Sequence, residues 1–142
     1  MASGGIHHID LNVSDVAASA CVYGPFLEFL GYRMVRDEAD SCEWDLMPTA
    51  DMPHGASIGI KACSETDRSH SHRRYAPGLH HLAWRADSQE QVDQWHKRLI
   101  EIGITVLDAP AHYPDYSGDY YAVFFEDPDG MKLELVHAPG WI

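Results

Sequence analysis

Apolar and polar residues follow two different periods along this chain, and those periods predict its strands and helices. Residues 6–13 alternate between polar and apolar side chains, which is typical of a strand with one polar face. A helix is expected to follow, and then three more strands, at 32–38, 42–47 and 56–63. The first half of the chain is therefore predicted to have the order βαβββ.

The predicted helix of the first half has recognisable start and stop signals. Ser14 or Asp15 can act as an N-cap, and apolar residues then recur at helical spacing. Gly24-Pro25 predicts a bend, or a second short helix that restarts at Pro25, because proline removes an intrahelical hydrogen bond. Gly31 is expected to end the helix.

The second half repeats the same order of elements. Residues 79–86 alternate like a strand, and Ser88 with Gln91 forms a capping box before a helix that Gly103 ends. We expect the rest of this half to consist of a short strand at 104–107, a loop at 108–118, and a hairpin of strands at 120–126 and 131–137.

A repeated motif links the two halves. The stretch from Gly5 to Leu11 recurs almost residue for residue from Gly78 to Trp84. An internal repeat of this kind indicates a duplicated module. The sequence therefore predicts one α+β domain over residues 1–142, with a first module at 5–63, a linker at 64–78 and a second module at 79–138.

Each repeated stretch carries a pair of histidines. The alternation places His8 and His81 on the polar faces of their strands, whereas His7 and His80 are expected to point toward the helices. On the last predicted strand, Glu134 and its two leucine neighbours point to opposite faces of the sheet. Glu134 is expected on the same face as His8 and His81. Two imidazoles and one carboxylate suit Fe(II), Mn(II), Ni(II) or Zn(II) and leave positions free for water and substrate. The alternative is two structural histidines and one solvated carboxylate.

The turn of the last hairpin sets which side chains share a face. Its sequence has Pro and Gly where a type I turn favours them. If Asp127 faces Gly130, then Tyr121 opposes Val136 and shares the face of Glu134. Tyr121 is therefore a candidate catalytic and substrate-binding residue, able to orient a bound oxygen or donate a proton. The alternative is a half-buried aromatic residue of the strand.

Two other features are candidates for substrate binding. Arg85 lies two residues after His81 on the same predicted face and can bind substrate charge. The polar segment 64–78 is rich in histidine and arginine and is predicted to be a loop. It can close over the site and hold an anionic substrate, or it is simply solvated.

Composition restricts the partners of the chain. The 22 acidic residues outnumber the 10 basic ones, giving a formal net charge of -12. Nucleic acids and anionic membranes bind basic surfaces, so small molecules are the expected partners. Three cysteines without close spacing indicate reduced thiols, and no signal sequence or membrane span is recognisable. A cytoplasmic location is therefore expected.

Four stretches of the sequence resemble the vicinal oxygen chelate superfamily, which includes glyoxalase I, extradiol dioxygenases, fosfomycin-resistance thiol transferases and bleomycin-resistance proteins. The resemblance covers nearly the whole chain, and its last stretch is the most specific. The four stretches are His8–Asp15, Phe29–Tyr32, His81–Trp84 and Phe124–Leu135. The resemblance implies paired βαβββ modules whose strands curl into an incomplete barrel of mixed β-sheet, with the helices outside.

The resemblance also implies a metal site. By motif, His8, His81 and Glu134 match the superfamily's ligand positions, so one divalent metal ion is expected as cofactor. A further acidic ligand of glyoxalase I aligns with Gly59, which cannot bind a metal. This departure favours the three-ligand members, which resemble the dioxygenases and the thiol transferases.

The function implied by the resemblance is that of a metal-dependent enzyme whose small substrate binds through two neighbouring oxygens. Lyase or isomerase chemistry and ring-cleaving dioxygenation are both open at this point. The alternatives are a bleomycin-resistance-type binding protein and a fosfomycin-type thiol transferase. Members of the superfamily commonly pair, so a homodimer is expected, with the metal site within one chain or across two.

Overall fold

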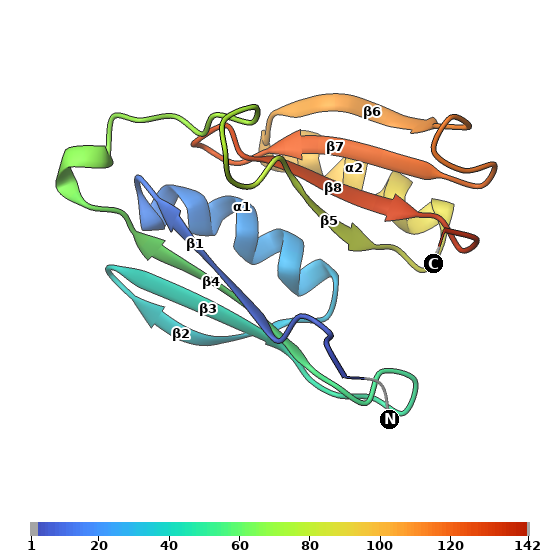
Figure 1. Ribbon diagram of the computed structural model, residues 1–142, viewed down its shortest axis with the longest axis horizontal. Helices are drawn as coiled ribbons and strands as arrows, with labels where there is room; N and C mark the ends of the chain where they lie inside the picture. Colours follow the sequence, from blue (N-terminus) through green and yellow to red (C-terminus); the bar gives the residue numbers. More distant parts are fainter. Residues whose placement is uncertain (1–2, 142) are drawn as a thin grey trace. The chain divides into compact units, whose positions relative to one another are not determined.

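The computed structural model describes residues 3–141, and the chain divides into two compact units, one ending at His70 and the other beginning at Ser71. Each unit contains one four-stranded mixed sheet and one α-helix, in the order βαβββ (Figure 1). The predicted α+β class and the paired βαβββ modules are confirmed. No helix in the described part of the chain has the length and hydrophobicity needed to cross a membrane.

The first unit has one helix on one face of its sheet. Its elements are β1 (His8–Val13), α1 (Val16–Phe29), β2 (Arg33–Glu38), β3 (Ser41–Leu46), β4 (Ala56–Ala62) and a short 3₁₀ turn (Glu65–Asp67). The sheet order is β1-β4-β3-β2, with β1 parallel to β4 and the other neighbours antiparallel. Helix α1 packs against β2, β3 and β4, and the core of this unit includes Phe26, Trp44 and Ile60.

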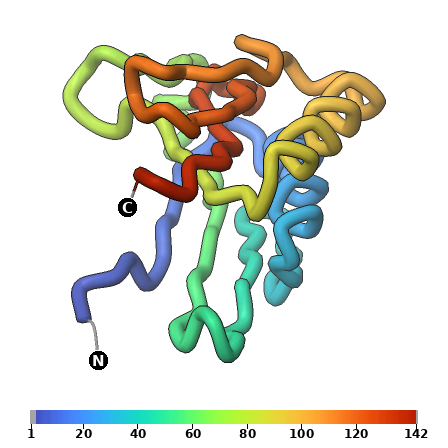
Figure 2. The backbone as a smooth tube through the Cα atoms, turned by 90° about the vertical axis from the view of Figure 1, so that its right-hand side faces the viewer, coloured from blue at the N-terminus to red at the C-terminus, as the bar shows by residue number. Residues whose placement is uncertain are grey.

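Helix α1 continues through Pro25 as one element, so the expectation of a second short helix is wrong. Asp15 caps its start, because the carboxylate accepts a 3.0 Å hydrogen bond from the Ala18 N–H. Tyr23 and Phe26, on either side of the proline, are fully buried. This burial on both sides holds the chain in the helix although proline offers no N–H. Figure 2 shows α1 as an unbroken blue coil.

The second unit repeats this arrangement. Its elements are β5 (Leu82–Arg85), α2 (Gln89–Ile102), β6 (Val106–His112), β7 (Tyr121–Glu126) and β8 (Lys132–His137). The sheet order is β5-β8-β7-β6, with β5 parallel to β8, and α2 packs against β6, β7 and β8. Ser88 caps α2 as predicted, by accepting a 3.1 Å hydrogen bond from the Gln91 N–H, and Gly103 ends it with a φ of 85°.

Strand β6 is longer than predicted and takes in part of the expected loop at 108–118. It lies at the edge of the sheet, and its pairing with β7 shifts register twice. An edge strand tolerates Pro110, because one side of such a strand makes no ladder hydrogen bonds. Pro110 is therefore compatible with a strand at this position.

The β7–β8 hairpin is paired one position away from the predicted register. Phe124 lies opposite Glu134, where the prediction placed the preceding residue. The loop holds three residues between Asp127 and Met131, because the Asp127 N–H donates to the Met131 carbonyl at 3.1 Å. Gly130 has a φ of 81°, as expected for the left-handed residue that completes a three-residue hairpin loop. The predicted turn was one residue too short.

The left-handed conformation of Gly130 gives the first test. A methyl group at this position meets no neighbouring atom, so the effect of Gly130→Ala reports the backbone conformation alone. We expect the variant to lower the free energy of unfolding by about 1–2 kcal/mol. Gly118 has equal space around it but no positive φ, so Gly118→Ala is the matched control and should not destabilise. Urea unfolding measures both, and equal stability of the two variants would contradict the turn.

Candidate functional site

A cavity of about 380 Å³ lies in the second unit, beside strands β5 and β8. These strands are parallel neighbours and place Ala83 directly opposite Glu134, so that the small alanine leaves room in front of the carboxylate. The cavity is lined by His81, Ala83, Trp84, Arg85, Tyr120, Glu134, Val136, Ala138 and Trp141. Two of the three predicted metal ligands, His81 and Glu134, are therefore brought together, along with Arg85.

The donor atoms of His81 and Glu134 lie side by side in this cavity. Nε2 of His81 is 3.1 Å from Oε2 of Glu134. Two ligands with bonds of about 2.0–2.2 Å to one ion, at tetrahedral or octahedral angles, are separated from each other by roughly 2.8–3.6 Å. The pair therefore has the spacing of two donors that share a metal ion.

The surroundings disfavour charge on both members of this pair. The Glu134 side chain is 1% exposed, and burial raises the pKa of its carboxyl against the opposing effects of the Tyr120 hydrogen bond and the Lys132 charge. Burial, followed by the charges of Lys132 and Arg74, lowers the pKa of His81. A bare ion pair is poorly stabilised in such a place. A dication would balance the carboxylate and accept the imidazole lone pair, so these residues fit a metal ion.

Tyr120 is the tyrosine beside Glu134, whereas the sequence favoured its neighbour Tyr121 for this place. Its hydroxyl donates a hydrogen bond to Oε1 of Glu134. Burial and this bond raise the pKa of Tyr120, so the residue keeps its proton at neutral pH and acts as a donor. A three-residue loop in the hairpin, if assumed from the start, would have placed Tyr120 on this face.

Tyr121 points to the other face of the sheet, which corrects the predicted orientation. Its hydroxyl donates at 2.6 Å to the Asp93 carboxylate of α2, and this bond is the main cause that raises the pKa of Tyr121 to about 12. The one-residue register error explains the difference, because neighbouring strand residues point to opposite faces. A catalytic or substrate-binding role for Tyr121 stays a prediction that these contacts do not support.

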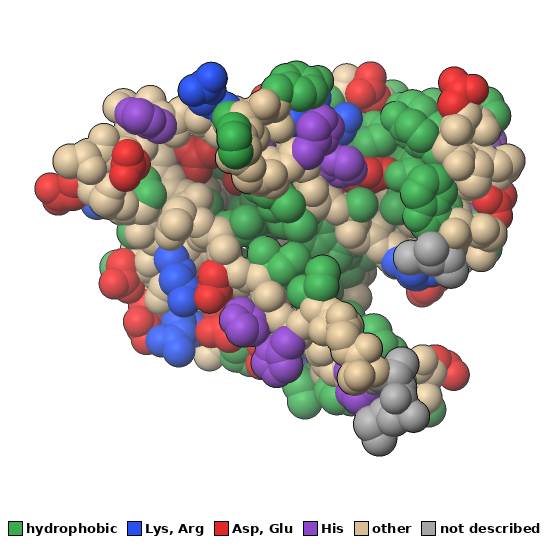
Figure 3. Space-filling model, viewed as in Figure 1, with side chains coloured by type: hydrophobic (Ala, Val, Ile, Leu, Met, Phe, Trp, Pro, Cys, Tyr) green, Lys and Arg blue, Asp and Glu red, His purple; other side chains and the backbone are tan. Residues whose placement is uncertain are grey.

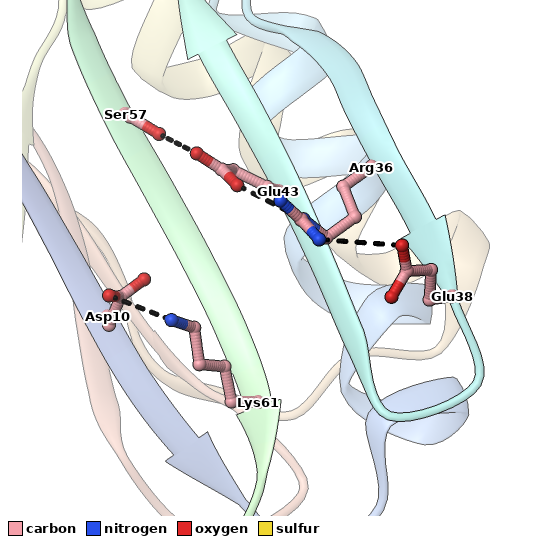
Figure 4. Close-up of polar contacts among 6 residues, drawn as sticks. All are labelled: Asp10, Arg36, Glu38, Glu43, Ser57 and Lys61. Carbon is pink, nitrogen blue, oxygen red and sulfur yellow. Dashed lines mark hydrogen bonds and ion pairs between the residues drawn. The ribbon is translucent and has the colours of Figure 1, made fainter.

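In the first unit, Gly59 occupies the position that Glu134 has in the second. Strand β1 pairs with β4 as β5 pairs with β8, and Asp10 lies opposite Gly59. A Cβ atom at position 59 would collide with Oδ1 of Asp10, so the Asp10 carboxylate fills the space of the missing side chain. Asp10 also forms a 3.1 Å ion pair with Lys61 (Figure 4). This face carries exposed charges where the second unit buries a carboxylate.

His8, the third predicted ligand, begins β1 and is exposed. Its Nδ1 lies 3.0 Å from Nδ1 of His7. It stays a prediction that His8 binds the same ion as His81 and Glu134. Within either unit, residues 3–141 contain no group of three His, Cys, Asp or Glu side chains placed to hold one ion.

The contact between Tyr120 and Glu134 can be tested by a pair of variants. Tyr120→Phe removes a donor from a carboxylate that is almost fully buried, and we expect it to lower the free energy of unfolding by about 1–3 kcal/mol. Tyr121→Phe leaves only the exposed Asp93 without its partner, and should cost less than about 1 kcal/mol because water replaces the bond. Urea unfolding at neutral pH compares them, and a greater loss in Tyr121→Phe would contradict the assignment.

Comparison with known proteins places this chain in a family. The sequence model of the Glyoxalase/Bleomycin resistance protein/Dioxygenase superfamily matches residues 5–135. The chain is 38% identical to the uncharacterised protein YqjT of Bacillus subtilis, over 92% of this chain and 97% of that protein. It is 28% identical to the metallothiol transferase FosB of Bacillus licheniformis, over 92% of this chain and 73% of that protein.

Solved structures give the same result. The glyoxalase family protein of Enterococcus faecalis is 29% identical and superimposes with a TM-score of 0.60, over 94% of this chain and 97% of that one. A crystal structure from Bacillus halodurans is 27% identical, with a TM-score of 0.76 over 95% of this chain and 96% of that one. The chain belongs to the glyoxalase, bleomycin resistance protein and dioxygenase superfamily.

Proposed function

We propose that this chain is a metal-dependent enzyme in which His8, His81 and Glu134 hold one divalent ion, Fe, Mn, Ni or Zn. The observation that carries the proposal is the 3.1 Å pair of His81 Nε2 and Glu134 Oε2, in a cavity and with the carboxylate buried. A structural carboxylate at this position would need several donors to offset its desolvation. Without an ion, Glu134 has the Tyr120 hydroxyl and at most one N–H from His81 Nε2. A bound ion would take the place of that N–H, accept the lone pair of Nε2 and balance the carboxylate charge.

When bound, the ion would act as a Lewis acid on a small substrate that presents two neighbouring oxygens. Tyr120 holds Glu134 in place through its hydroxyl and, because its proton is retained, does not serve as the base. Trp84 and Trp141 line the same cavity and suit an apolar or aromatic part of the substrate. Arg85 gives the cavity a positive charge that can bind an anionic group of the substrate.

The reaction class we propose is lyase or isomerase chemistry, or ring-cleaving dioxygenation if the ion is Fe(II). Both use a substrate with two adjacent oxygens on one metal.

The three cysteines are free, which supports the expected reducing, cytoplasmic location.

Metal content tests the proposal directly. We expect the purified protein, after reconstitution with Fe(II), Mn(II), Ni(II) or Zn(II), to hold about one ion per chain, as a single three-ligand site requires. His8→Ala, His81→Ala and Glu134→Gln should each lose the ion while the thermal unfolding transition remains cooperative. Asp93→Asn is the control. It changes a carboxylate of α2, on the other face of the second sheet, and the variant should keep its full metal content. Unchanged metal content in the three ligand variants would contradict the site.

A thiol transferase is the second candidate, favoured by the similarity to the metallothiol transferase FosB. It would use the same ion but consume a thiol, so loss of free thiol in the presence of fosfomycin separates it from a lyase or dioxygenase. A bleomycin-resistance-type binding protein is the non-enzymatic alternative. Protein that takes up no metal on reconstitution would favour that alternative.

A mixing experiment tests how His8 joins the site. We propose a homodimer, in which the ligands of one ion come from one chain or from two. His8→Ala and Glu134→Gln subunits, unfolded together and refolded as a mixture, form half of their dimers as mixed pairs. If the ligands come from two chains, each mixed dimer regains one complete site, and the mixture recovers about one quarter of an ion per chain. Recovery of no metal would show that each site lies within one chain.

A further inference from the structure

The first histidine of each repeated pair contacts the second one, and this corrects the expectation that it points toward a helix. The Nδ1 atoms of His7 and His8 lie 3.0 Å apart, and those of His80 and His81 lie 2.8 Å apart. Within the pairs the ring planes are inclined at 90° and 75°. Figure 3 shows histidine side chains exposed in adjacent pairs. Because the contact forms twice at repeated positions, it belongs to the duplicated module and not to one local packing arrangement.

Hydrogen-bond chemistry gives this contact a consequence for metal binding. Two imidazole nitrogens can form a hydrogen bond only if one carries the hydrogen and the other a lone pair. His81 can bind an ion through Nε2 only if that atom has its lone pair free, and the neutral ring then carries its hydrogen on Nδ1. That hydrogen faces Nδ1 of His80, which accepts it when His80 carries its own hydrogen on Nε2.

We propose that His80 and His7 are positioning residues, which hold His81 and His8 in the tautomer and ring orientation that present Nε2 to the ion. This inference rests on the proposed metal site. Metal-bound histidines usually donate their second N–H to a carboxylate, a backbone carbonyl or water. Here a neutral imidazole takes that place, so the ligand is oriented without a further negative charge near the ion.

The His80 ring in the second unit also contacts a tyrosine ring at the surface. The rings of Tyr75 and His80 meet edge to face, with centroids 5.3 Å apart and planes inclined at 72°. His80 is exposed, so its replacement leaves the core of the unit unchanged. A change in metal affinity on replacing His80 would therefore report its contact with His81.

The test compares His80→Ala with His80→Asn in the full chain. Zn²⁺ affinity is measured by competition with a chromophoric chelator, and thermal unfolding checks the fold. His80→Ala should weaken Zn²⁺ binding by about 10–100-fold with unchanged stoichiometry at saturation. His80→Asn should restore most of the affinity, because the amide oxygen of asparagine stands where Nδ1 of histidine stood and accepts the same hydrogen bond. His96→Ala, on α2, is the control and should bind as the wild type does.

A second measurement follows the tautomer itself. In the Zn²⁺-loaded wild type, ¹⁵N NMR should show the hydrogen of His81 on Nδ1 and the ion on Nε2. Equal affinity of His80→Ala and the wild type, or an affinity of His80→Asn as low as that of His80→Ala, would overturn the positioning role and leave the metal site intact. Loss of stoichiometry in His80→Ala would overturn it too, because His80 would then be a ligand. Absence of Zn²⁺ binding by the wild type would overturn both proposals.

Discussion

The burial of the Glu134 carboxylate is the physical constraint on which the functional site depends. A carboxylate removed from water costs several kcal/mol unless hydrogen bonds or an opposite charge compensate it. The buried acidic side chains of the described residues are Asp127 and Glu134. Asp127 is compensated by the hairpin loop, where it accepts two backbone hydrogen bonds of 2.9 Å. Glu134 instead faces a cavity. Burial raises the pKa of Glu134 and lowers that of His81, so a charged pair of the two is disfavoured.

The two units share one fold but carry different side chains on the open face of the sheet. Both sheets pair their first strand in parallel with their last, and both cover one face with a helix. In the first unit the open face carries exposed ion pairs, such as Lys61 with Asp10, which contribute about 0–1 kcal/mol each. In the second unit, the corresponding face has Ala83 opposite Glu134, and a cavity lies in front of them. In the first unit the acidic residue, Asp10, is on the first strand of the sheet and lies opposite the small residue, Gly59, on the last strand. The second unit has the reverse arrangement.

Much of the fold could be read from the sequence, because its signals are local. The alternation of the strands, the caps at Asp15 and Ser88, and the glycine that ends α2 all depend on neighbouring residues alone. The errors at two prolines came from effects of tertiary structure. Pro25 remains inside a helix because buried residues flank it, and Pro110 remains inside a strand because that strand lies at an edge.

The site was predictable to the extent that it depends on strand parity. Parity alone placed His81 and Glu134 on one face, and their side chains do meet. It could not decide between Tyr120 and Tyr121, because that choice depends on whether the hairpin loop has two or three residues. It also could not reveal the contacts within the histidine pairs, which depend on side-chain rotamers of exposed residues.

The most direct test of the central claim is a crystal structure of the metal-reconstituted protein with anomalous scattering data collected at the absorption edge of the ion. The account predicts one anomalous peak per chain, with Nε2 of His81 and an oxygen of Glu134 each about 2.0–2.2 Å from it. An anomalous map with no peak beside these two side chains, at full metal occupancy of the protein in solution, would contradict it.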